Sequence, residues 1–334
     1  MSYKLFTKYF LICISTILFI VLVFNFAVDP YNKYNINLFN IEHKLTRDDR
    51  GFKIGQINNI EKIDNLIIGS SRSQMLDPQL LSKFFGGVSY NFGVGGGKIE
   101  DALGLVYYLE KEKKLPKNIL LAVDFSGFNI NSKPHSDFLN SKELNFFNNQ
   151  SNSIDISHFL SIDTTRSTFK TLKMFFRQEK PLYYFDQNGL IQGPMKSIDI
   201  FNIESLSNKY FEIQYSNGQF NIDTQRVDYF KKFVQLCKKH NINLKIFLTP
   251  VFSYQLSLLQ SHKELQTIHL KLLDSLSSIH PIYNFMQENK HTKNIDFFTD
   301  NIHYKKEMGN IILFSIYLNN SNTDTIFVYH DKQN

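Results

Sequence analysis

The sequence predicts an α/β protein in which helices cover both faces of a mostly parallel five-stranded sheet, giving a three-layer α/β/α sandwich. Short, fully apolar runs alternate along the chain with longer amphipathic stretches, and turn-forming residues follow the ends of the runs. This alternation is typical of strand, helix, strand units joined by right-handed crossovers. A third feature, a long uncharged segment near the N-terminus, predicts one transmembrane helix ahead of the domain.

The uncharged segment at residues 9–28 is long enough to cross a bilayer, at ~1.5 Å per residue over ~30 Å of hydrocarbon. Lys4 and Lys8 precede it, so residues 1–8 are expected in the cytoplasm and the remainder of the chain outside it. A cleaved signal peptide is the alternative, but Asn25-Phe26-Ala27 lacks the small residues of a cleavage site. We therefore expect an uncleaved anchor in the inner (plasma) membrane and a domain in the periplasm or outside the cell.

Residues 29–61 are rich in Asn, Tyr and Lys and show little periodicity, which favours a linker before a domain at residues 62–334. Asp77 is predicted to be a helix N-cap, and Pro78 is predicted to be the first residue of that helix. The predicted strands are 63–68, 88–92, 118–123, 244–248 and 281–285, with an edge strand at 324–330. The predicted helices are 78–85, 99–113, 224–240, 254–278 and 305–318, the second with Leu103, Val106, Tyr107 and Leu109 facing inward.

Residues 130–215 interrupt this alternation, because Asn, Ser and aromatic residues are mixed there without a clear period. We interpret them as an insertion that packs over the edge of the sheet. The pattern leaves two readings open, a lid that contacts the substrate and an insertion with no part in the site.

Composition excludes several functional classes. The 37 Lys and Arg against 31 Asp and Glu give a net charge of +6, but the basic residues are scattered, so nucleic acid is not an expected partner. Cys13 and Cys237 predict no structural disulfide. The histidines show no ligand spacing, and Gly93 to Lys98 fits neither the P-loop nor the dinucleotide fingerprint, so no metal or cofactor is expected.

Two short segments carry the candidate chemistry. Ser71 follows the first predicted strand, at the sheet edge where open α/β sheets place their sites, and Asp300 and His303 lie three residues apart far downstream. A serine nucleophile needs a base and a group that orients the base, and these residues can fill the three roles. Each residue could instead have a purely structural role: Ser71 and Asp300 could cap helices, and His303 could be a surface residue. Ser70 is the alternative nucleophile.

Further residues complete this hypothesis. The Ser71 amide and the Gly93 amide are candidate donors to an oxyanion. Arg72 is expected to be structural and paired with Asp124, or else to contact an anionic substrate.

The blocks Gly69-Ser70-Ser71, Asn91-Phe92-Gly93 and Asp300-Asn301-Ile302-His303 resemble the spaced blocks of the SGNH/GDSL hydrolase superfamily. The apolar N-terminus, Asp29-Pro30-Tyr31 and Gly-Ser-Ser-Arg resemble its membrane-anchored bacterial members, which serve polysaccharide O-acetylation and D-alanylation. The resemblance covers residues 65–129 and 296–318.

The resemblance implies a flavodoxin-like fold, with Ser71 as nucleophile, His303 as base, Asp300 as its partner and Gly93 as an oxyanion glycine. The third-block Gly-x-Asn-Asp is replaced by Asp124-Phe125-Ser126-Gly127-Phe128-Asn129, which makes Asn129 the candidate third donor.

These expectations combine into a membrane-anchored extracytoplasmic serine esterase or O-acyltransferase that acts on an acetyl group of a cell-surface glycan. Whether water or a sugar hydroxyl accepts the acyl group stays open. The expected binding partners are a glycan or an acylated small-molecule substrate, and a membrane-bound acyltransferase is a candidate protein partner. The alternative is a catalytically inactive scaffold or glycan-binding subunit of a polysaccharide modification or export complex.

Overall fold

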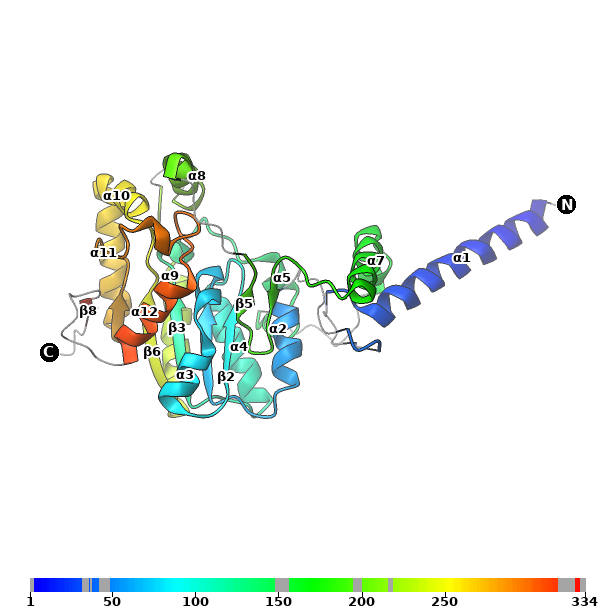
Figure 1. The fold of residues 1–334 in the computed structure, drawn as a ribbon, viewed down its shortest axis with the longest axis horizontal. Coiled ribbons are helices and arrows are strands. Elements are labelled where there is room, and N and C mark those ends of the chain that lie inside the picture. The colour runs from blue at the N-terminus through cyan, green and yellow to red at the C-terminus, as the bar shows by residue number, and fades with distance from the viewer. Residues whose placement is uncertain are drawn as a thin grey trace. The chain divides into compact units, whose positions relative to one another are not determined.

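The computed structural model describes residues 3–31, 36, 38–41, 49–147, 156–194, 200–215, 219–317 and 328–330. The chain divides into two compact units (Figure 1). We call residues 1–59 and 149–184 the anchor unit, and residues 60–148 and 185–334 the sheet unit. The insertion expected at 130–215 is therefore divided between the two units.

The anchor unit begins with helix α1 (Tyr3–Val28), which is long and apolar enough to cross a membrane. Helices α6 (Ile156–Phe159) and α7 (Ile162–Arg177) belong to the same unit. The segment 29–61, expected to be a linker, contains helix α2 (Asp49–Asn58). Its apolar residues Phe52, Ile54 and Ile57 are buried, so this short helix is stabilised by packing that a mostly polar local sequence does not reveal.

The sheet unit contains the predicted five parallel strands in the order β2-β1-β3-β6-β7, with β8 added antiparallel to β7. This is the flavodoxin-like strand order. The strands are β1 (Asn65–Gly69), β2 (Ser89–Gly93), β3 (Asn118–Val123), β6 (Asn243–Leu248), β7 (Ile282–Asn284) and β8 (Val328–His330). The fold class predicted from the sequence is confirmed. Of the expected edge strand at 324–330, residues 324–327 lie outside the described residues.

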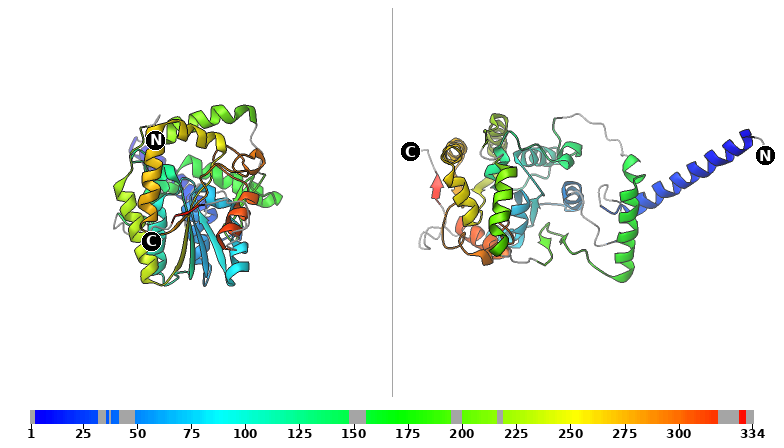
Figure 2. Two further views of the ribbon diagram at one scale, coloured as in Figure 1. Left: turned by 90° about the vertical axis from the view of Figure 1, so that its left-hand side faces the viewer. Right: turned by 90° about the horizontal axis from the view of Figure 1, so that it is seen from above.

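Helices cover both faces of this sheet (Figures 1 and 2). One face carries α3 (Pro78–Phe85) and α12 (Lys306–Tyr317), and the other carries α4 (Ile99–Lys111), α9 (Thr224–Lys239) and α11 (Lys263–Ser277). Side chains alternate along the strands between the two faces of the sheet. On the face covered by α12, Ile67, Leu120 and Phe247 form a hydrophobic core with Met308 and Ile312 of that helix. The remaining elements with assigned bounds are α5 (Ser136–Asn140), β4 (Tyr184–Phe185), β5 (Ile191–Gln192), α8 (Ile203–Gln214) and α10 (Ser253–Ser261).

A row of asparagines fixes the register at the amino ends of three neighbouring strands. Asn65, Asn118 and Asn243 are register partners across β1, β3 and β6. The amide of Asn243 donates to Asn118 (2.9 Å), and that of Asn118 donates to Asn65 (2.7 Å). A slip by one residue would break these bonds and turn the apolar side chains to the wrong face, so the opposite, carboxyl ends of the strands are also held level.

Two details of the predicted helices are wrong. The single helix expected at 254–278 is broken at His262, which has an extended backbone and whose Nδ1 lies 2.8 Å from the carbonyl oxygen of Leu258. Tyr107 is 39% exposed, whereas Val106 and Leu109 are fully buried. Tyr107 lies about 100° around the helix from Val106, at the flank of the buried face.

Candidate active site

The strand β1 delivers Ser71 to the carboxyl edge of the sheet through a short 3-10 turn, η1 (Ser71–Met75). Ser70 caps this turn, because its Oγ accepts a hydrogen bond from the Arg72 amide at 3.2 Å. Ser73 Oγ donates to the Ser70 carbonyl oxygen at 2.7 Å. Gly69 is needed at the strand end, since a Cβ there would lie 2.7 Å from the Ala122 Cβ. The two serines therefore have different roles, and the candidate nucleophile is Ser71 rather than Ser70.

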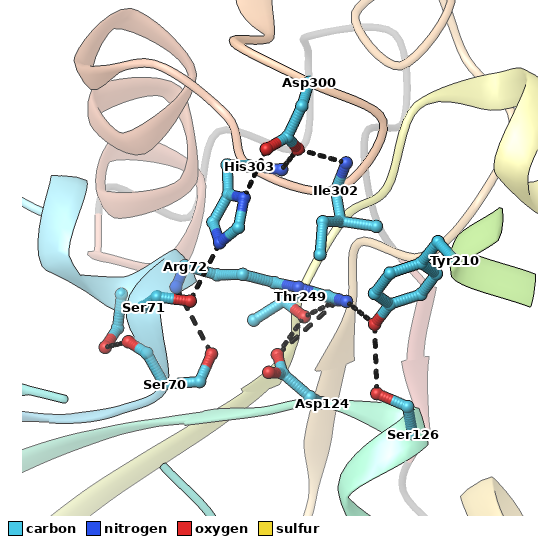
Figure 3. Close-up of polar contacts among 11 residues, drawn as sticks. Ser70, Ser71, Arg72, Asp124, Ser126, Tyr210, Thr249, Asp300, Ile302 and His303 are labelled. Atoms are coloured by element: carbon cyan, nitrogen blue, oxygen red, sulfur yellow. Dashed lines mark hydrogen bonds and ion pairs between the residues drawn. The ribbon is translucent and has the colours of Figure 1, made fainter. Parts of the chain in front are cut away.

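Ser71, His303 and Asp300 form one hydrogen-bonded relay (Figure 3). Ser71 Oγ lies 2.8 Å from His303 Nε2, and His303 Nδ1 lies 2.6 Å from Asp300 Oδ2. Both distances are those of hydrogen bonds, and the carboxylate fixes the tautomer in which Nδ1 carries the proton and Nε2 faces the serine. The three residues predicted from the sequence are thus brought together in the order that nucleophilic catalysis requires.

The loop that carries the base is a tight turn closed by its own backbone. The Thr299 amide donates to the carbonyl oxygen of His303 at 2.8 Å, and Phe298 forms a bridge with Tyr304. Asp300 Oδ1 accepts the amides of Ile302 and His303 at 2.8 and 2.7 Å. Asp300 is therefore both a local cap, as its structural reading proposed, and the partner of the imidazole.

The ionisation of Asp300 follows from these contacts. Burial opposes the charged carboxylate, but the hydrogen bond and charge of His303, together with the two backbone amides, lower the pKa of Asp300 below its ordinary value. Asp300 is consequently an anion throughout the neutral pH range, as an orienting partner of the base must be.

Arg72 points away from the relay into a second polar cluster below the turn (Figure 3). Arg72 is 3% exposed. Its Nη1 donates to Thr249 Oγ1 at 2.9 Å and lies 3.6 Å from Asp124 Oδ1. Its Nη2 donates to the Tyr210 hydroxyl at 2.7 Å. Thr249 in turn donates to Asp124 at 2.6 Å, and Tyr210 lies 3.2 Å from Ser126 Oγ.

Burial disfavours the charged guanidinium, but the neighbouring carboxylate of Asp124 holds the pKa of Arg72 above its usual value. The expected pairing of Arg72 with Asp124 is therefore present. A guanidinium this deeply buried and already engaged is not available to bind an anionic substrate.

Two of the three predicted oxyanion donors, Gly93 and Asn129, are engaged elsewhere. The Gly93 amide donates to the side-chain oxygen of Asn91 at 2.7 Å, and the Asn91 amide group donates to the carbonyl oxygens of Ser73 and Leu76, each at 2.8 Å. Gly93 therefore supports the underside of the nucleophile turn, and a Cβ at this position would overlap Ser73 Oγ, so no side chain fits. Its amide is not available as an oxyanion donor in this geometry, which corrects the expectation from the sequence.

Asn129 also differs from expectation. Its side chain is buried, donates to the carbonyl oxygen of Gln214 at 3.1 Å and accepts the amide of Asn131 at 3.1 Å. It holds the end of α8 and is not directed at Ser71. Among the described residues, the Ser71 amide has no acceptor, so it is the one of the three predicted donors that stays available to an oxyanion.

Three residues of the polar cluster around Arg72, namely Thr249, Ser126 and Tyr210, were not predicted from the sequence. Thr249 follows strand β6 directly, so the rule that sites gather at the carboxyl ends of parallel strands was a usable signal for it. Ser126 lies in the turn after β3 for the same reason. Tyr210 lies on α8 within the insertion, where no periodic pattern indicated its direction.

Within the described part of the chain, no group of three His, Cys, Asp or Glu side chains is arranged to hold a metal ion. No protein-family model matches the sequence, and comparison with curated proteins identifies no relative. The assignment of chemistry to this site therefore depends on its own geometry.

Proposed function

We propose that the protein is a membrane-anchored, extracytoplasmic serine esterase or O-acyltransferase that acts on an acetyl group carried by a cell-surface glycan. The observation that carries this proposal is the Ser71, His303 and Asp300 relay, assembled from segments 232 residues apart in the sequence. A serine, a histidine and a carboxylate in hydrogen-bond series is the arrangement that activates a hydroxyl for acyl transfer.

In the proposed reaction, Ser71 Oγ attacks the acyl carbonyl carbon while its proton passes to His303 Nε2. Asp300 stabilises the imidazolium that forms. The tetrahedral intermediate collapses when the imidazolium returns the proton to the departing alkoxide oxygen, leaving an acyl ester on Ser71. An acceptor hydroxyl then attacks this ester and gives its proton to His303, and the second tetrahedral intermediate collapses as His303 returns that proton to Ser71 Oγ and the acyl product leaves. Water as acceptor makes the protein an esterase, and a sugar hydroxyl makes it a transferase.

Helix α1 supports the proposed location, since it is long and apolar enough to span a membrane. The proposed orientation, with residues 1–8 in the cytoplasm and the sheet unit in the periplasm or outside, depends on Lys4 and Lys8. The glycan substrate and a membrane-bound acyltransferase as partner are implied by the resemblance of the sequence blocks to anchored SGNH proteins.

A specific observation favours a second candidate function. The amide of Gly93 and the side chain of Asn129 are already bonded within the protein, so of the three predicted donors only the Ser71 amide remains for an oxyanion among the described residues. Each oxyanion donor lowers the barrier by roughly 3 kcal/mol, and the loss of two of them would leave little turnover. The second candidate is therefore an inactive scaffold or glycan-binding subunit of a polysaccharide modification or export complex.

Covalent labelling separates the two candidates. The full-length protein in detergent is treated with a fluorophosphonate probe, and the modified residue is identified by mass spectrometry. We expect the probe on Ser71, its loss in Ser71→Ala, and labelling slower by about 10²- to 10⁴-fold in His303→Ala, because the base is removed. Ser70→Ala is the matched control, since it removes a neighbouring serine that only caps the turn. Absence of labelling in a protein with unchanged thermal unfolding would favour the scaffold.

A further inference from the structure

Helix α7 of the anchor unit exposes a row of large apolar side chains. Ile162, Phe169 and Phe176 are 72%, 62% and 79% exposed, and they follow one another at intervals of seven residues. Seven residues are close to two helical turns, so the three side chains lie on one face. Single exposed apolar residues are common on protein surfaces, but an aligned row of them indicates a binding surface.

The opposite face of α7 holds its most deeply buried side chains, and it is mainly polar. Thr164, Thr168 and Thr171 are fully buried, together with Met174. A helix at the surface of a water-soluble domain turns its apolar side inward. In α7 the polarity is reversed, which indicates that the outward face meets an apolar medium rather than water.

Contacts with α1 set the level at which α7 lies. The buried side chain of Asn25 donates to Thr165 Oγ1 at 2.9 Å and to the carbonyl oxygen of Phe159 at 2.7 Å, and it accepts the hydroxyl of Thr168 at 2.8 Å. The ring of Phe169 lies 5.1 Å from that of Phe24.

Phe24 and Asn25 belong to the last turns of α1, within about 6 Å of its end at ~1.5 Å per residue. Within the anchor unit, α7 runs across α1 rather than along it (Figures 1 and 2). A helix placed across the end of a membrane span lies along the surface of the membrane that the span leaves.

Charge on α7 favours the same surroundings. Its exposed basic residues Arg166, Lys170, Lys173 and Arg177 follow one flank of the apolar row, and Asp163 is the acidic residue of the helix. Lys and Arg beside an apolar face are typical of helices that lie in a bilayer interface, where the cations meet phosphate groups.

We propose that α7 is an interfacial helix: its Ile162, Phe169 and Phe176 face enters the boundary between headgroups and acyl chains of an anionic phospholipid bilayer, and its basic flank binds the phosphates. This inference depends on α1 spanning that bilayer, as the proposed function requires. The helix then fixes the anchor unit at the membrane at two places, the span and the interface.

The absence of tryptophan from the chain provides the test, because one introduced indole is the sole tryptophan emitter. Phe176→Trp is made in the full-length protein, which is reconstituted alone into phosphatidylcholine vesicles with and without phosphatidylglycerol. The lipids are unmodified, brominated near the headgroup end of the acyl chain, or brominated near its methyl end to reach the bilayer centre, and iodide is the aqueous quencher. Leu18→Trp, in the middle of α1 and 47% exposed, reports the span.

On reconstitution, we expect the emission of Phe176→Trp to shift to the blue, to lose most of its intensity in brominated lipid and to resist quenching by iodide. All three effects should be stronger in vesicles that contain phosphatidylglycerol. Emission that iodide quenches and brominated lipid does not would overturn the proposal and leave the face to a protein partner, which is absent from these vesicles. Lipid quenching that is equal with and without phosphatidylglycerol would overturn the anionic preference. If Leu18→Trp also escapes lipid quenching, the anchor itself fails; if it is quenched, only the interfacial helix fails.

Discussion

Replacing Arg72 by Met tests whether the buried cluster below the nucleophile turn stabilises the fold. The guanidinium is 3% exposed and contacts Asp124, Thr249 and Tyr210. Met fills a similar volume but supplies neither charge nor donors. Asp124, whose side chain is 13% exposed, would then be a largely buried anion whose cation is missing, and the Tyr210 hydroxyl would lose a donor at 2.7 Å.

The size of the effect follows from the ion-pair distance. At the 3.6 Å between Arg72 Nη1 and Asp124 Oδ1, the Coulomb attraction is about 5 kcal/mol for an effective dielectric constant of about 20. Removing one partner of a buried pair costs about 3–5 kcal/mol, because the other charge keeps its desolvation penalty. For a protein of this size the melting temperature should fall by about 10 °C.

Thermal unfolding of the full-length protein in detergent, followed by circular dichroism, measures this change. Lys117→Met is the matched control: its side chain is 71% exposed and lies 3.3 Å from Asp64, so its melting temperature should change by no more than about 2 °C.

The double variant Arg72→Met, Asp124→Leu should recover much of the loss, since no unpaired charge remains. A melting temperature of Arg72→Met equal to that of Lys117→Met, or losses that simply add in the double variant, would refute the reasoning.

Two further predictions concern the sheet unit. His269 is buried, and burial lowers its pKa from 6.5 to about 4, so the unfolded state binds more protons between these values and stability rises with pH across that window. On acidification across this window, His269→Phe should lose about 3 kcal/mol less of its free energy of unfolding, measured by urea denaturation, than the unmodified protein. An unchanged pH dependence would contradict this. Gly104→Ala should destabilise α4 by about 1–3 kcal/mol despite a helix-propensity gain of about 1 kcal/mol, because the new Cβ overlaps the carbonyl oxygen of Leu144. Gly127→Ala, with no atom within 4 Å of its Cβ, is the control, and equal melting temperatures of the two variants would oppose the argument.

The fold was predictable because the strands of the parallel sheet are short apolar runs with clear ends. The predicted strand at 118–123 and the helix start at Asp77 and Pro78 match the structure, since burial on both faces and a helix cap are properties of local sequence. The break at His262 was not predictable in this way. No Gly or Pro marks it, and the contact of its ring with Leu258 forms only in the folded chain.

The relay was predictable for a different reason. Asp300 and His303 are neighbours in one turn, and Ser71 lies in the turn after strand β1, at the edge where such turns gather, so the topology brings them together. The role of Gly93 was missed although a local signal existed. Asn91 precedes it by two residues, and an Asn side chain often accepts the amide two residues on. This hydrogen bond occupies the Gly93 amide, so the amide cannot donate to an oxyanion.

The nucleophile turn is supported by a residue of the insertion. In a 3-10 turn successive side chains point about 120° apart, so Ser71 can face His303 while Arg72 faces into the protein. The hydroxyl that receives Arg72 comes from Tyr210 on α8, inside the insertion. A displacement of α8 therefore acts on the residue next to the nucleophile. The other part of the insertion, α6 and α7, belongs to the anchor unit and bonds to Asn25 of α1. Neither part is a decoration: one supports the turn that carries Ser71, and the other supports the end of the helix suited to span a membrane.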